Sequence, residues 1–413
     1  SRYPALVTGE GILRTVFSAV KSASQGRGLE RVFITGVSPL VLSDMTSGYN
    51  VAETIYLRPE FNDLCGFREA ELATVVEQLV HDCGLSADVA TTVLTTMQTF
   101  YNGYCFSPQR DQVIYNPTLC LYFLKEFQRD CQAPEELLDS NLEMDKHKLT
   151  YIATRQHGGT LIRTALLADP PVTVDSLSKR FDLSELLKAD QDPQVLAALL
   201  YYLGVLTLQG RHGLGKLALR IPNLVVRQLY VERLQELLLP DSTARLEVTQ
   251  LAELFYQTGQ LQPLCDFISS HPFSVFDNRD STTATELVLK AVCVALLFNS
   301  RYYQMDSETA LGRRYADLTM IVHPNMRQYH LFDFLFEFKF VKLNEVNLTG
   351  ADVKQKTLAE LKALPRVATQ LSAATTQVQS YRPVLQQTYG EPLRLRAYAV
   401  VAVGFERLVW EEV

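Results

Sequence analysis

The sequence predicts an α/β protein of several domains. Its 413 residues exceed what a single hydrophobic core ordinarily holds, so two or three domains are expected. Helix-like and strand-like segments alternate in the last third, which is typical of an α/β domain. A helix, a hairpin and a second helix between residues 193 and 239 have the layout of a winged helix. Apolar residues make up 47% and charged residues 21%, as in ordinary globular proteins.

The first third is expected to be mostly helical. Residues 11–24 have the spacing of an amphipathic helix, and the continuous apolar run RVFITGV at 31–37 predicts a buried parallel strand. Two helices are expected over 68–100, separated at CGLSAD, where Gly84 ends the first and Ser86 caps the second. A further helix is predicted at TLCLYFLKEF, residues 118–127.

The middle third is expected to be helical and charged over 140–190, with a break at His157–Gly159. Two strands then flank the glycine-rich turn GRHGLGK, residues 210–216. This turn matches the spacing GxxxxGK of a phosphate-binding loop. Leu217 stands where such a loop needs Ser or Thr, and a strand follows instead of a helix, so the segment predicts a hairpin turn. A helical stretch is expected over 242–270.

The last third predicts a helix over 284–298, two strands in YADLTMIV (315–322) and HLFDFLFEFKFVKL (330–343), a long polar helix over 351–381 and a further strand over 394–405. The net charge of −7 does not favour nucleic-acid binding. However, the section from residue 275 onward holds 16 basic and 15 acidic residues, so the acidity lies upstream of it. The last third can therefore approach phosphate without a general electrostatic penalty.

The seven cysteines form no CxxC motif and are odd in number. We therefore expect them to be reduced and mostly packed, in an intracellular setting of cytoplasm or nucleus, without structural zinc or a disulfide framework. No apolar run reaches the roughly 20 residues that a bilayer span needs, so no membrane contact is expected. Because the chain begins at Ser1 and not at Met, a fragment or processed chain is expected, and targeting signals cannot be judged.

Three charged side chains on the two predicted strands form a candidate site. Asp317 lies on the first strand, while Glu337 and Lys339 lie two residues apart on the second and so share one face. Carboxylates on neighbouring strands suit Mg²⁺ or Mn²⁺, which lowers the pKa of a bound water and neutralises phosphate charge. The lysine would position that water or stabilise developing charge.

A solvated strand face with an incidental Glu–Lys pair is the simpler alternative. The apolar opposite face of the strand argues against it, because unpaired charge on a core strand is costly. Gly312–Arg314 precedes the first strand and could supply phosphate-binding charge. In addition, Gln377 and Tyr381 lie four residues apart and therefore on one face of the following helix.

Asp317, Glu337-Phe338-Lys339 and Gln377-x-x-x-Tyr381 together resemble the PD-(D/E)XK nuclease superfamily. The Gln-x-x-x-Tyr element is similar to a motif of helicase-associated exonucleases in it. The resemblance implies a restriction-endonuclease-like αβββαβ domain, with Asp317 and Glu337 as metal ligands, Lys339 as the catalytic lysine, and Gln377 and Tyr381 as orienting groups. Members often add an acid from the first helix; Glu286 fits that place best and Glu308 second.

The upstream segments resemble AAA-ATPase-like proteins that carry such a nuclease domain at the C-terminus. The similarity lies in RVFITGVSPLVLSDMTSGYN, LCGFREAEL, FYNGYCF, IYNP, LLYYLGVLTL and LRIPN, in that order. The resemblance implies a partial P-loop ATPase-like region at 1–125, a helical and winged-helix-like region at 126–240, a helical connector at 241–274 and the nuclease-like domain at 275–413. The P-loop would lie before Ser1, so ATP binding is expected only if that part is present.

Two functions are therefore weighed. The first is a divalent-metal-dependent nuclease that hydrolyses phosphodiester bonds, with DNA as the expected target and Mg²⁺ or Mn²⁺ as cofactor. The second is a catalytically silent nuclease fold that binds or regulates through protein or nucleic-acid contacts. A protein partner or a homo-oligomer is compatible with both.

Overall fold

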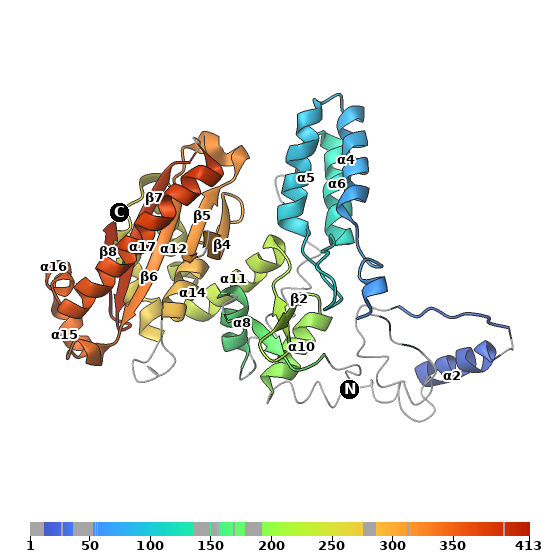
Figure 1. Cartoon of the computed structure of the whole chain (residues 1–413), viewed down its shortest axis with the longest axis horizontal. Helices are drawn as coiled ribbons and strands as arrows, with labels where there is room; N and C mark the ends of the chain where they lie inside the picture. The colour runs from blue at the N-terminus through green and yellow to red at the C-terminus, as the bar shows by residue number, and fades with distance from the viewer. Residues whose placement is uncertain are drawn as a thin grey trace. The chain divides into compact units, whose positions relative to one another are not determined.

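The structure is a computed structural model, which describes most of the chain (Figure 1). The described residues are 12–25, 28–35, 53, 55, 57–134, 137, 149, 155, 157–167, 170–177, 192–275, 286–311, 314–390 and 393–413. The chain divides into two compact units, one of residues 1–161 and 171–229, the other of residues 162–170 and 230–413. No helix in the described part combines the length and the apolar character needed to cross a bilayer.

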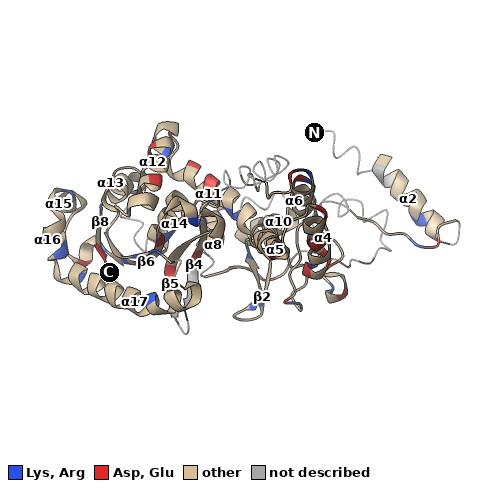
Figure 2. Cartoon of the chain, turned by 90° about the horizontal axis from the view of Figure 1, so that it is seen from above, with Lys and Arg blue, Asp and Glu red and all other residues tan. Residues whose placement is uncertain are grey.

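Three helices of the first unit pack against one another: α4 (Glu69–Asp82), α5 (Ala87–Tyr101) and α6 (Pro117–Asp130). Apolar residues recur every three or four positions along each helix and are buried, for example Leu72, Val76 and Val80 in α4. The first two helices are separated at Gly84 and Ser86, as the sequence predicts. Figure 2 shows acidic residues repeated along α4.

The segment before these helices differs from the expectation. The amphipathic helix is present as α2 (Ile12–Ser24), but residues 31–35 contain no strand. Phe33 is 67% exposed and Val32 37% exposed. The predicted strand is therefore wrong over 31–35, because an apolar run becomes a buried strand only when neighbouring strands pair with it. Residues 36 and 37 of the predicted strand lie outside the described residues.

The cysteine prediction also needs correction. Cys83 and Cys131, which follow the ends of α4 and α6, form a disulfide. Cys105, Cys120, Cys265 and Cys293 are free and buried, as expected, and Cys65 is free and exposed. Sequence spacing could not find the pair, because 48 positions separate its members and only helix packing brings them together. Cys83 and Cys131 are therefore not reduced, so this pair does not support the expected intracellular setting.

The helix–hairpin–helix arrangement is present in the middle of the chain. It consists of α10 (Pro193–Tyr202), β2 (Thr207–His212), β3 (Lys216–Arg220) and α11 (Leu224–Leu238), preceded by α8 (Gly158–Leu167) and β1 (Val172–Val174). The antiparallel sheet has the order β1-β3-β2, and residues 213–215 form the hairpin turn. Gly158, expected in a break, begins α8, while most of 140–190 lies outside the described residues.

The second unit contains a mixed five-stranded sheet. The strands are β4 (Tyr303–Leu311), β5 (Arg314–Val322), β6 (Asp333–Val341), β7 (Leu395–Val403) and β8 (Arg407–Glu412), in that spatial order. Only β6 and β7 are parallel, and α15 (Gly350–Gln355), α16 (Leu358–Lys362) and α17 (Pro365–Tyr389) lie between them in sequence. The mixed α/β expectation is confirmed, and β8 extends the expected strand order.

Helices cover both faces of this sheet, as Figure 1 shows for α17 in front and α12 (Ser242–Thr258) behind. Leu335 of β6 packs with Val378 and Tyr381 of α17. On the other face, the ring of Phe255 from α12 stacks on Phe334 at 4.2 Å between centroids. Residues 241–274, expected as a connector, therefore pack on the sheet through α12 and α13 (Gln262–Ser270).

Asp333 fixes the beginning of β6. Its side chain is fully buried and accepts hydrogen bonds from the backbone N–H groups of Val322 and Arg394, both at 2.8 Å. The guanidinium of Arg327 donates to both carboxylate oxygens, at 2.5 and 2.8 Å. One carboxylate thus ties together the end of β5, the beginning of β6 and the residue before β7.

Candidate functional site

The hydrogen-bonded ladder between β5 and β6 is short. It joins only Leu318 with Phe336, Thr319 with Leu335, and Met320 with Phe334, whereas β6 pairs with β7 along its whole length. One position beyond the ladder, the antiparallel register places Asp317 opposite Glu337. There the backbone N–H of Phe338 donates to Oδ2 of Asp317 at 2.8 Å. A carboxylate therefore replaces a backbone acceptor at the point where the ladder stops.

Glu337 and Lys339 lie on the face of the sheet that α17 covers. Side chains alternate along a strand, so Leu335, which contacts α17, shares its face with Glu337 and Lys339. Lys339 Nζ donates to Glu337 Oε1 at 2.7 Å. Glu337 is 2% exposed, and its Oε2 has no hydrogen-bond partner in the part of the chain that the structure describes. Burying a carboxylate oxygen without a hydrogen-bond donor costs free energy.

The electrostatics of this pair follow from burial and crowding. Burial, and next the negative charge of Asp317, raise the pKa of Glu337 to about 7. Burial lowers the pKa of Lys339, but the hydrogen bond to Glu337 and the surrounding carboxylates outweigh it, so its pKa lies above the ordinary value. The carboxylates therefore repel one another, and the lysine compensates only part of that repulsion.

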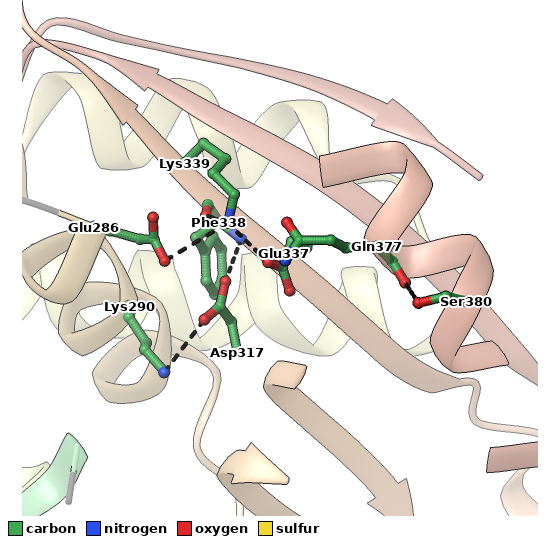
Figure 3. Close-up of polar contacts among 8 residues, drawn as sticks. All are labelled: Glu286, Lys290, Asp317, Glu337, Phe338, Lys339, Gln377 and Ser380. Carbon is green, nitrogen blue, oxygen red and sulfur yellow. Dashed lines mark hydrogen bonds and ion pairs between the residues drawn. The ribbon is translucent and has the colours of Figure 1, made fainter. Parts of the chain in front are cut away.

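Helix α14 (Glu286–Leu297) brings an acid and a second lysine to the same place (Figure 3). Glu286 Oε1 lies 3.7 Å from Lys339 Nζ. Burial raises the pKa of Glu286, as does the charge of Asp317 to a smaller extent. One turn later, Lys290 is 1% exposed, and its Nζ lies 3.4 Å from Oδ1 of Asp317. Both oxygens of Asp317 thus have a nitrogen donor from the protein.

Helix α17 contributes Gln377 and Tyr381. Figure 3 shows the Gln377 side chain directed towards Glu337. Burial, followed by the negative charges of Glu337 and Asp317, raises the pKa of Tyr381, while a hydrogen bond with Gln377 opposes the rise. The spacing of four residues therefore places both side chains beside the carboxylates, as the helical period predicts.

The structure thus brings six predicted residues into one neighbourhood: Glu286, Asp317, Glu337, Lys339, Gln377 and Tyr381. The side chain of Glu308, the second choice for an acid, and Arg313 lie outside the described part. Sequence reasoning missed Lys290. The available signal was a lone charge in the apolar helix segment 287–297, at helical spacing from Glu286.

The described carboxylates of this neighbourhood form no closed metal cage. Among the described residues, no group of three or more His, Cys, Asp and Glu side chains is close enough to hold a metal ion. Lysines are interleaved between the carboxylates. A closed cage is not required, because Mg²⁺ is commonly held by one or two carboxylates and keeps several waters. Glu337, whose Oε2 has no hydrogen-bond partner among the described residues, lies opposite Asp317 in the strand register, which suits such an open arrangement.

Comparison with protein-family models, with curated proteins and with solved structures found no match to this chain.

Proposed function

We propose that the second unit is a divalent-metal-dependent nuclease of the restriction-endonuclease-like type. The observation that carries the proposal is the buried Oε2 of Glu337, which has no donor in the described part of the chain and stands beside Asp317 where the β5–β6 ladder stops. Stability alone gives no reason to keep a buried acid half-satisfied, whereas a cation site does.

In this proposal Asp317 and Glu337 hold the cation and Glu286 is the third acid. When bound, Mg²⁺ or Mn²⁺ supplies an acidified water and neutralises charge on the phosphate. Lys339 remains an ammonium because its pKa is raised, and it is 16% exposed by side chain. It can therefore donate to a substrate oxygen as negative charge develops there.

Gln377 and Tyr381 are proposed to orient the carboxylates and the substrate. Tyr381 is 2% exposed, so it acts on the acids from within the core, whereas Gln377 adjoins Glu337 from the α17 side. In the proposed reaction the oxygen of a water forms a new bond to phosphorus while one ester P–O bond breaks. The water loses a proton and the leaving oxygen takes one up, which gives a phosphomonoester and an alcohol. DNA is the proposed target, and ATP enters only with a phosphate-binding segment upstream of Ser1.

Cleavage assays test the proposal directly. Purified protein is incubated with linear and circular DNA in Mg²⁺, in Mn²⁺ and in EDTA. We expect cleavage with metal, none with EDTA, and a loss of at least about 100-fold in Lys339→Ala, the scale on which one electrostatic donor contributes. Lys354→Ala, at an exposed lysine of α15, is the matched control and should cleave normally.

Equal cleavage by wild type and Lys339→Ala would end the assignment. DNA binding that persists in EDTA, without cleavage under any condition, would instead favour the catalytically silent module.

A further inference from the structure

The buried lysine of α14 has no role in the proposed chemistry, although it lies against a proposed metal ligand. Lys290 is 1% exposed and lies in the continuously buried stretch Leu289–Leu297. An ammonium group in such surroundings needs a counter-charge, and Asp317 provides one at 3.4 Å. Because Lys290 is almost fully buried, it acts on the centre through the acids beside it, Asp317 and Glu286.

The contacts of Asp317 limit what it can bind. Oδ1 faces Lys290 Nζ at 3.4 Å, and Oδ2 accepts the N–H of Phe338 at 2.8 Å. In a two-metal site the ions stand about 3.5–4 Å apart. One carboxylate then usually spans them with its two oxygens. Lys290 already places a positive group beside Oδ1 of Asp317, and Figure 3 shows this contact on the α14 side of the carboxylate.

The charges lead to the same conclusion. With all three acids ionised, Glu286, Asp317 and Glu337 are balanced by the two ammonium groups of Lys290 and Lys339, which leaves a net charge of −1. One divalent cation changes this charge to +1, which a substrate phosphate neutralises. A second divalent cation would raise the total to +3, which already includes the fixed buried ammonium group of Lys290.

We propose that Lys290 is a positioning residue that holds Asp317 and restricts the centre to one divalent cation. This inference rests on the proposed function, since it concerns the same carboxylates. Lys290 would supply the positive charge that a second cation otherwise brings, and Glu337 Oε2 would remain available to the single ion. The centre would then combine one exchangeable cation with one fixed ammonium group.

Mn²⁺ titration of the full chain without nucleic acid tests the inference, with free Mn²⁺ followed by electron paramagnetic resonance. Wild type should bind one Mn²⁺ per chain. Lys290→Met, which keeps the length but removes the charge, should bind up to two and show the spectrum of an exchange-coupled Mn²⁺ pair. Lys290→Gln is a second variant in case the first does not fold, and Lys354→Met is the surface control that should stay at one.

Two bound ions in wild type would overturn the inference while leaving the nuclease proposal intact. A folded Lys290→Met or Lys290→Gln protein that still binds a single Mn²⁺ would also overturn it. One Mn²⁺ bound by wild type and two Mn²⁺ bound by either variant would support it. No Mn²⁺ binding by wild type, together with no DNA cleavage, would overturn the proposed function and this inference with it. Circular dichroism establishes that each variant is folded.

Discussion

Replacing Asp333 by Ala should destabilise the second unit strongly. The carboxylate is fully buried and accepts four hydrogen bonds, two from Arg327 and one each from the N–H groups of Val322 and Arg394. Breaking a buried ion pair by removing one partner costs about 3–5 kcal/mol. Folded proteins have a total stability of about 5–15 kcal/mol, so the variant should be marginal.

Urea unfolding followed by circular dichroism measures this loss. With a urea dependence of about 1–3 kcal/mol per molar, a loss of about 4 kcal/mol lowers the midpoint of the affected transition by more than about 1 M. Asp333→Asn should lie between wild type and Asp333→Ala, because it keeps one acceptor oxygen but loses the charge.

Glu337→Gln is the matched control, since it changes an equally buried acid on the same strand. Glu337 has one partnered oxygen and one without a partner among the described residues, so its desolvation cost offsets its pairing. Without divalent metal the stability should change by less than about 1 kcal/mol. An unchanged urea midpoint in Asp333→Ala, or an equal fall in Asp333→Asn and Glu337→Gln, would contradict the expected difference between these two buried acids.

Three further predictions concern other parts of the chain. Replacing Cys83 and Cys131 by Ser should lower the stability of the first unit by up to about 4 kcal/mol, because the disulfide spans 48 positions. Cys65→Ser, at a free cysteine, should leave the stability unchanged. Equal urea midpoints for the double variant and wild type would contradict this prediction. Burial lowers the pKa of His323, so between its folded pKa and 6.5 the unfolded chain binds more protons, and stability falls as the pH drops below about 6.5. His323→Gln should flatten that slope by at most about 1.4 kcal/mol per pH unit, as urea unfolding at several pH values would show. Gly103→Ala should lower the free energy of unfolding by more than about 2 kcal/mol, because φ is +120° and the new Cβ would lie 1.9 Å from the carbonyl oxygen of Pro222. Gly84→Ala is the control, since φ is +67° and the space around it is open, and it should cost about 1 kcal/mol. Equal thermal midpoints of the two variants would argue against the clash.

Much of the local structure was predictable because it depends on periodicity. The helices at α4, α5, α6, α10 and α14 and the strands at β5, β6 and β7 follow from apolar residues spaced at 3.6 or 2 positions, or from continuous apolar runs. The same alternation placed Glu337 and Lys339 on one face, and helical spacing put Gln377 beside Tyr381. At 31–35 the local rule failed, because an apolar run contains no information about its neighbours.

By itself, the sequence determined on which strand or helix each candidate side chain lies, such as Asp317 on β5, Glu337 on β6 and Tyr381 on α17. Only the tertiary structure decided that the β5–β6 ladder stops beside Asp317, that Lys290 faces this acid and that Glu337 keeps an oxygen without a donor in the described part of the chain. The disulfide between Cys83 and Cys131 was likewise decided only by the tertiary structure. Each depends on register and packing between segments far apart in sequence, which no local pattern of residues encodes.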